Sequence, residues 1–133
     1  MAHLKNLQTL GLARTQITDA GLEHLAALTH LTKRDFRATR ITDKGLHAST
    51  PLQQLTELCL SGTPITDAGL KELTALGNLT LLDLPETAVT DAGLPDLAKW
   101  KMLLYVVLYK TKVTEQGAAP LEKSLPSCQI YHF

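Results

Sequence analysis

The sequence predicts an α/β fold, a right-handed solenoid with a parallel β-sheet on its concave side and α-helices on its convex side. Apolar spacing switches within each repeat from period two to helical spacing, and the copies keep one register without insertion. A fixed period of 24 residues runs through the β-branched positions Ile17, Ile41, Ile65, Val89 and Val113. A single strand–turn–helix unit cannot bury its apolar face alone, so we expect neighbouring copies to stack.

The first half of each repeat is expected to form a short strand. Leu10, Gly11 and Leu12 alternate with period two, as a strand with one buried face requires. A threonine column follows in the turn, and we interpret it as structural because buried hydroxyl groups are normally hydrogen bonded. Its members are Thr15, Thr39, Thr63, Thr87 and Thr111.

The second half of each repeat is expected to form a helix on the outer side. In the first copy, Thr18 is the predicted N-cap and Asp19 lies in the first turn, where a negative charge suits the helix dipole. A glycine recurs two residues after the acid, and we expect it to let neighbouring helices approach closely, since glycine in a helix costs about 1 kcal/mol against alanine. The glycines are Gly21, Gly45, Gly69, Gly93 and Gly117.

The repeated pattern L-x-x-L-x-L-x-x-T-x-I, followed by Thr-Asp-x-Gly-Leu, resembles the leucine-rich-repeat family. The 24-residue length is similar to the bacterial type, GALA-like and planctomycete-like. This resemblance implies a short horseshoe arc that binds proteins on its concave side. We expect a single domain over residues 1–133. Its repeats are 7–30, 31–54, 55–78, 79–102 and 103–126, and 127–133 forms a closing segment.

Two parts of the array depart from the pattern. The first repeat begins at Leu4 and Leu7 without a polar cap, so we expect either a truncated parent protein or a face that pairs with another chain. In repeat two, Arg34 and Ser49 replace leucines. A buried guanidinium needs partners, for which Ser49 and Thr39 are candidates, or a route to solvent. This weak repeat is either a tolerated defect or a hinge or contact point.

The concave face carries the candidate site, because its residues vary while the frame repeats. Repeat two is basic there, repeats three and four are acidic, and repeat five supplies two tyrosines, a residue type common among interface hot spots. The alternative is that these are merely solvated sheet residues. The candidate partner contacts are Lys33, Arg37, Glu57, Asp83, Tyr105 and Tyr109.

Catalysis, metal binding and cofactors find no support in the sequence. Cys59 has no histidine near it in the predicted geometry, and the five histidines share no column. Cys59 and Cys128 are about three repeats apart, roughly 14 Å at strand spacing and too far for a disulfide. Free thiols and the absence of a signal peptide slightly favour the cytoplasm over export.

Composition narrows the range of partners. The 13 basic and 13 acidic residues balance, which argues against nucleic acid, and no apolar run is long enough to span a membrane. We therefore expect a protein-binding module, part of a larger bacterial protein and not an enzyme. The alternative is a self-associating module that forms a homodimer through its uncapped first repeat or its concave face.

Overall fold

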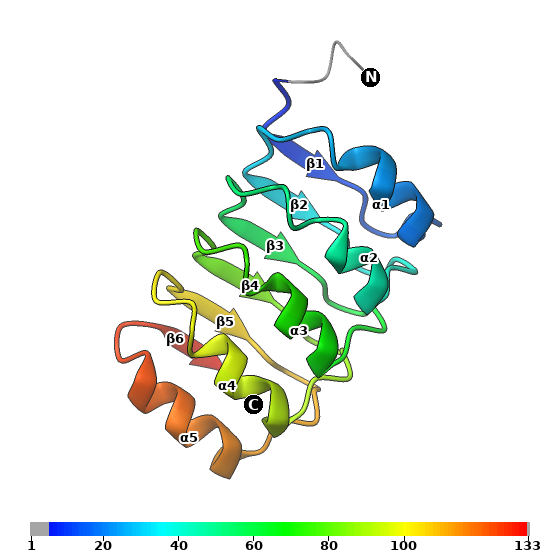
Figure 1. Ribbon diagram of the computed structural model, residues 1–133. Coiled ribbons are helices and arrows are strands. Elements are labelled where there is room, and N and C mark those ends of the chain that lie inside the picture. Colours follow the sequence, from blue (N-terminus) through cyan, green and yellow to red (C-terminus); the bar gives the residue numbers. More distant parts are fainter. Residues whose placement is uncertain (1–5, 133) are drawn as a thin grey trace.

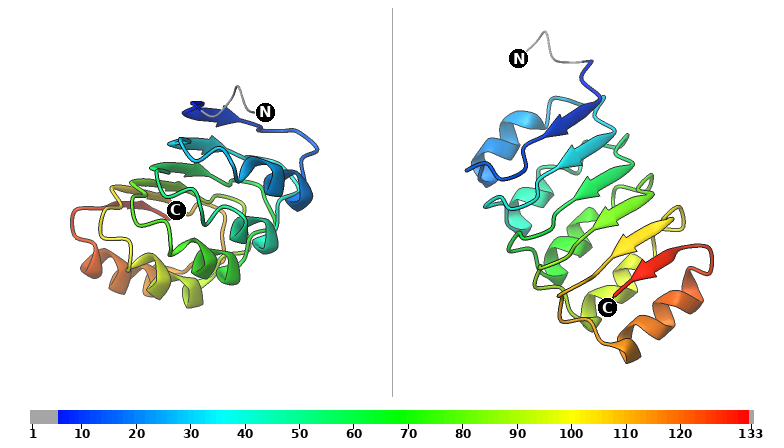
Figure 2. Two further views of the ribbon diagram at one scale, coloured as in Figure 1. Left: turned by 45° about the horizontal axis from the view of Figure 1, so that its top comes forward. Right: turned by 180° about the vertical axis from the view of Figure 1, so that it is seen from behind.

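The computed structural model describes residues 6–132 and confirms the predicted architecture (Figure 1). Six parallel strands form one sheet in the order β1-β2-β3-β4-β5-β6. The strands are β1 (Thr9–Gly11), β2 (Lys33–Asp35), β3 (Glu57–Cys59), β4 (Leu81–Asp83), β5 (Tyr105–Val107) and β6 (Gln129–Tyr131). The helices all lie on one side of the sheet, the convex side, as the two views of Figure 2 show. Leu4 and Phe133 lie outside the described residues.

The helices begin at the acid of their repeat, as the sequence predicted, except in repeat four, where a 3₁₀ turn begins there. They are α1 (Asp19–Leu25), α2 (Asp43–His47), α3 (Asp67–Leu73), α4 (Leu94–Leu97) and α5 (Glu115–Ser124). In repeat four, a 3₁₀ turn at Asp91–Gly93 precedes α4, which has Pro95 in its first turn. Within residues 6–132, no helix is long and apolar enough to cross a membrane.

Strand register follows the repeat period without a slip. Leu10 pairs with Arg34, Arg34 with Leu58, Leu58 with Leu82, and so on to Ile130. In β2 to β5 the middle residue of each strand is buried and the two flanking residues are at least partly accessible. The middle residues therefore face the core, and the flanking residues line the concave surface.

Each turn after a strand is built in the same way. The threonine hydroxyl donates to the carbonyl three residues earlier, as in Thr63 to Leu60 at 2.6 Å and Thr87 to Leu84 at 2.7 Å. All five threonines of the column make this bond, so their structural role is confirmed. The residue before each threonine has a positive φ between 55° and 71°, and glycine occupies this position only once, at Gly62.

An aspartate–threonine link joins each repeat to the next, which the sequence analysis did not foresee. The Asp19 carboxylate accepts hydrogen bonds from the Thr42 backbone N–H at 2.8 Å and the Thr42 hydroxyl at 2.5 Å. The same pair of bonds recurs at three further junctions, which join Asp43 to Thr66, Asp67 to Thr90 and Asp91 to Thr114.

This link gives the glycine column a more specific role than close helix approach. A Cβ atom on Gly45 would overlap the Asp19 carboxylate, and the later glycines stand in the same relation to the aspartate of the repeat before them. The glycine leaves room for the carboxylate. Thr18 occupies the predicted N-cap position of α1, but its side chain makes no cap hydrogen bond, and neither does that of Thr42. The side chains of Thr66, Thr90 and Thr114 do cap their own helices.

Repeat two is irregular, as its sequence indicated. Arg34 is 2% exposed; its Nη1 donates to Ser49 Oγ at 3.2 Å, and its guanidinium lies 4.7 Å from the centroid of the Phe36 ring. Its Nε and Nη2 have no hydrogen-bond partner among the described residues. Burial lowers the pKa of Arg34 to about 10. Of the two expected partners, Ser49 is confirmed, whereas Thr39 donates to the Phe36 carbonyl instead.

Candidate functional site on the concave face

Two columns of side chains run across the concave face, one for each accessible position of the strands. The first column contains three of the predicted site residues, Lys33, Glu57 and Tyr105, and continues to Gln129. The second contains Asp83 and continues to Tyr131. Arg37 and Tyr109 each follow a strand by two residues. The structure thus distributes the six predicted residues over four repeats and does not gather them at one point.

Two basic residues of repeat two, Lys33 and Arg37, are neutralised by acids of the same face. Lys33 Nζ lies 3.0 Å from Glu57 Oε1 in the next repeat. Arg37 holds Asp35 with two parallel bonds, Nε to Oδ1 at 2.9 Å and Nη2 to Oδ2 at 2.6 Å. The hydrogen bonds from Arg37 lower the pKa of Asp35. The predicted charge gradient is therefore paired internally, and Asp35 is a partner that sequence reasoning did not assign.

Asp83 differs from the other charged residues of the two columns. Within residues 6–132 its carboxylate makes no ion pair or side-chain hydrogen bond, and it stands between Cys59 and Val107 in the sheet register. Burial raises the pKa of Asp83 and the repulsion of Asp35 adds to this, while Arg37 acts in the opposite direction. A half-buried carboxylate with free acceptor positions can receive donors from a bound partner.

Three tyrosines form an aromatic patch at the C-terminal end of the concave face. Tyr105, Tyr109 and Tyr131 are 44%, 37% and 40% exposed. The Tyr109 and Tyr131 ring centroids lie 6.4 Å apart at 47°, and the Tyr131 hydroxyl donates to Gln129 Oε1 at 2.5 Å. Tyr131 was missed in the sequence analysis, although it lies 24 residues after Val107 and so continues that column.

The thiol on this face is a poor nucleophile. Burial, followed by the repulsion of Asp83 and Asp35, raises the pKa of Cys59 to about 11. His47 pairs with Glu72 across the helical side, so it does not serve Cys59 as a base. Cys59 and Cys128 are free, as expected. Among the described residues no three His, Cys, Asp or Glu side chains are placed to hold a metal ion.

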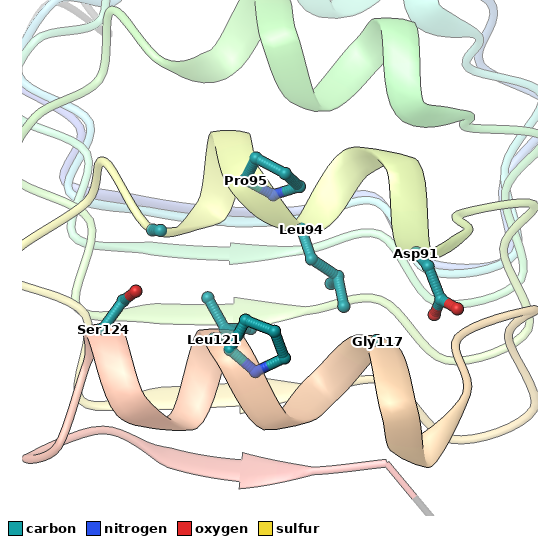
Figure 3. A pocket seen from close by; sticks show the side chains of 8 residues that line it. Asp91, Leu94, Pro95, Gly117, Leu121 and Ser124 are labelled. Carbon is teal, nitrogen blue, oxygen red and sulfur yellow. The ribbon is translucent and has the colours of Figure 1, made fainter.

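A second concavity lies on the convex side, between α4 and α5 (Figure 3). This groove of about 380 Å³ is mainly apolar and is lined in part by Leu94, Pro95 and Leu121, with Asp91 at one end and Ser124 at the other. Asp91 already accepts two bonds from Thr114. The groove therefore offers mainly apolar surface, and its acid is already engaged by Thr114.

Comparisons with known proteins agree with this geometry. The leucine-rich-repeat family model matches residues 3–26 and 52–73. No curated protein sequence matches the chain. A leucine-rich-repeat protein of Leptospira interrogans is similar in structure, with a TM-score of 0.65, 24% identity, and coverage of 96% of this chain and 37% of that one. An internalin of Listeria monocytogenes gives a TM-score of 0.59, 21% identity, and coverage of 99% and 49%. The chain thus spans less than half of either protein.

Proposed function

We propose that this chain, which is a leucine-rich-repeat protein, binds a protein partner with the C-terminal half of its concave face. The observation that carries the proposal is the aromatic patch, Tyr105, Tyr109 and Tyr131, exposed together on a sheet surface. Tyrosine supplies a large contact area at low cost in side-chain entropy and is enriched among interface hot spots. If these tyrosines were merely solvated residues of the sheet, there would be no reason for them to be grouped.

The neighbouring charges support this half of the face over the other. Lys33, Glu57 and Arg37 are held in ion pairs with residues of their own face, so we assign them to the rim of the contact. Asp83 has no such pair and borders the patch through Val107 and Tyr131 in the sheet register. It is the residue we expect to receive a donor or a cation from the partner.

We propose that the module works without catalysis and is part of a larger bacterial protein. The raised pKa of Cys59 and the absence of a base beside it in the described residues support a binding role. The Leptospira and Listeria proteins described above come from bacteria and are longer than this chain, which supports the second part.

The test begins by capturing the partner through the patch. A photo-crosslinking amino acid at position 105 is expected to trap the partner in cells, whereas the same probe at Glu23, exposed on α1, is expected to trap none. The captured protein is then purified and titrated by calorimetry. Tyr105→Ala and Tyr109→Ala should each weaken binding by about tenfold, the loss typical of a hot-spot residue. Unchanged affinity in the double variant would remove the proposal.

Self-association is the second candidate, and the partly exposed apolar side chains of the first repeat favour it. Light scattering separates the two candidates. A mass that rises with protein concentration supports a homodimer, and a mass of one chain at all concentrations supports a foreign partner.

A further inference from the structure

Each junction between repeats uses a socket in the later repeat. The socket consists of the backbone N–H and hydroxyl of the threonine before the helix, together with the space left by the helix glycine. In repeat three these are Thr66 and Gly69, and the Asp43 carboxylate of repeat two fills the socket. The described part of the chain contains four filled sockets of this kind.

The first repeat carries the same socket, and nothing in residues 6–132 fills it. Thr18 is exposed, and neither its backbone N–H nor its hydroxyl makes a hydrogen bond within that range. A Cβ atom on Gly21 would meet only Ile17 of its own repeat, not a carboxylate. Glycine at this position costs helix stability, and within the described chain no neighbouring carboxylate accounts for it.

Apolar surface surrounds this socket. Leu10, Leu12 and Ile17 are only partly buried, whereas their equivalents two repeats later, Leu58, Leu60 and Ile65, are 0% exposed. Within the described sheet, the outer edge of β1 has no strand beside it. The first repeat therefore presents the complete surface that every later repeat uses to receive its neighbour. We call this surface the first-repeat face.

We propose that the first-repeat face docks a further leucine-rich repeat of the same type, whose aspartate enters the Thr18–Gly21 socket. The docked repeat adds a parallel strand to the edge of β1 and covers the leucines. This is the same interface that the chain forms four times within itself, with the same carboxylate chemistry.

A second copy of this chain does not fit the socket. Glu115 occupies the aspartate position of the last repeat, but β6 follows it in the sheet. A copy whose β6 met β1 would place Glu115 two strands away from Thr18, whereas linked residues lie in adjacent repeats. Two copies meeting face to face would bring no carboxylate, since Asp19 points to Thr42.

The test supplies such a repeat by fusion. A copy of residues 55–78 is placed directly before Leu7, which preserves the 24-residue spacing. We expect the urea midpoint to rise and the Thr18 amide to become protected from hydrogen exchange, because the added carboxylate binds it. The matched control carries Asp67→Ala in the added copy only, and it should leave the Thr18 amide unprotected.

Gly21→Ala provides the second readout. In the original chain a Cβ on Gly21 would lie 2.7 Å from Ile17 Cγ1, so the partly buried Ile17 side chain has to shift, but no carboxylate is displaced. The substitution should therefore change the unfolding equilibrium constant by no more than about threefold. In the extended chain it should cost about tenfold or more, because the Cβ would displace the new carboxylate. Gly69→Ala, whose socket is filled in both chains, should cost the same in each.

Several results would overturn the proposal. They are an equal cost of Gly21→Ala in the two chains, an added repeat that unfolds in a separate transition, and a Thr18 amide that exchanges as fast with the extension as without it. Dimerisation of the original chain that Leu10→Asp abolishes would also overturn it, since a second copy would then occupy the face.

Discussion

At the level of single residues, Arg34 stands where leucine or valine occupies the same strand position in the other repeats. It is almost fully buried, with one hydrogen bond to Ser49 and contact with the Phe36 ring, while two of its nitrogens have no partner in the described chain. A buried cation with so few of its hydrogen bonds made is destabilising relative to an apolar residue of similar size.

We predict that Arg34→Leu raises the free energy of unfolding by about 1–3 kcal/mol, because it removes the desolvated charge and restores the leucine column. Ser49→Ala should lower it by about 1 kcal/mol, because it takes away the one hydrogen bond of the guanidinium. Urea unfolding curves of both variants measure this. An unchanged or lower midpoint for Arg34→Leu would show that Phe36 and Ser49 satisfy the cation.

Single residues also show which features of the candidate site could be predicted from the sequence. The accessible columns were predicted correctly because side chains alternate along a strand with period two. Tyr131 could have been placed by extending the 24-residue spacing into the closing segment. The bidentate pair of Arg37 with Asp35 depends on side-chain rotamers, which the repeat spacing does not determine.

At the scale of elements, the turn after each strand stores backbone strain. Arg14, Ala38, Glu86 and Lys110 have φ values between 55° and 59°, a region costly for residues with a Cβ. Gly62 holds the equivalent position at φ 71°, and a Cβ there would meet only ordinary contacts with Ala38. Backbone conformation alone therefore decides substitutions at Gly62.

Gly62→Ala is predicted to lower the free energy of unfolding by about 1 kcal/mol through the strained φ. Ala38→Gly should act in the opposite direction, by about 0.5 kcal/mol, because glycine also loses more chain entropy on folding. Thermal unfolding of the two variants checks the pair. A stabilised Gly62→Ala would mean that the turn relaxes to a negative φ.

The aspartate–threonine link makes a second prediction at this scale. Hydrogen bonds from the Thr114 side chain and backbone lower the pKa of Asp91 below the ordinary aspartate value of 3.8. A lowered carboxyl pKa gives stability that is present above the unfolded value and lost as pH falls through the folded value. Asp91 therefore contributes to acid unfolding below about pH 4.

Denaturant midpoints measured between pH 6 and pH 3 are expected to fall less in Asp91→Asn than in the parent chain. Asp83→Asn is the control, because burial raises the pKa of Asp83 and gives it the opposite linkage. Its midpoint should fall at least as steeply as that of the parent. The same decline in all three proteins would show that Asp91 does not take part.

The sequence predicted the acid near the start of each helix but not the role of the aspartates in linking one repeat to the next. An aspartate after a threonine is typical of a helix N-terminus, so Asp19 was assigned to its own helix dipole. The link to Thr42 crosses 23 residues of chain and becomes visible only when the repeats are stacked. The glycine column depends on the same stacking.

At the scale of the whole molecule, stability should vary along the array. The apolar residues of repeats three and four are almost fully buried, whereas several of the first repeat are only partly covered. In a solenoid each repeat is stabilised by its direct neighbours, so end repeats open more readily than central ones.

Native-state hydrogen exchange should therefore show slow amides in β3 and β4 and faster exchange in β1 and α1. Repeat two should exchange faster than repeat three, because α2 has 5 residues against 7 in α3 and its core contains Arg34. Exchange measured by NMR on the uniformly labelled chain gives the comparison. Uniform protection from β1 to β5 would mean that the array opens only as one unit.

The overall fold could be predicted because the fixed period sets the register, and the register places every strand beside the next. The ion pairs of the concave face could not be predicted in this way, because they form between side chains of neighbouring strands. Lys33 and Glu57 stand side by side only because one strand lies next to the other.

That internal pairing has a kinetic consequence. Because acids of the same face match Lys33, Arg37 and Lys110, these cations project little field into solution and do little to attract a charged partner from a distance. Association should then proceed at the unassisted rate, on the order of 10⁵–10⁶ M⁻¹s⁻¹, and change little with ionic strength. Tight binding would have to come from slow dissociation, which depends on how completely the partner covers the tyrosine rings.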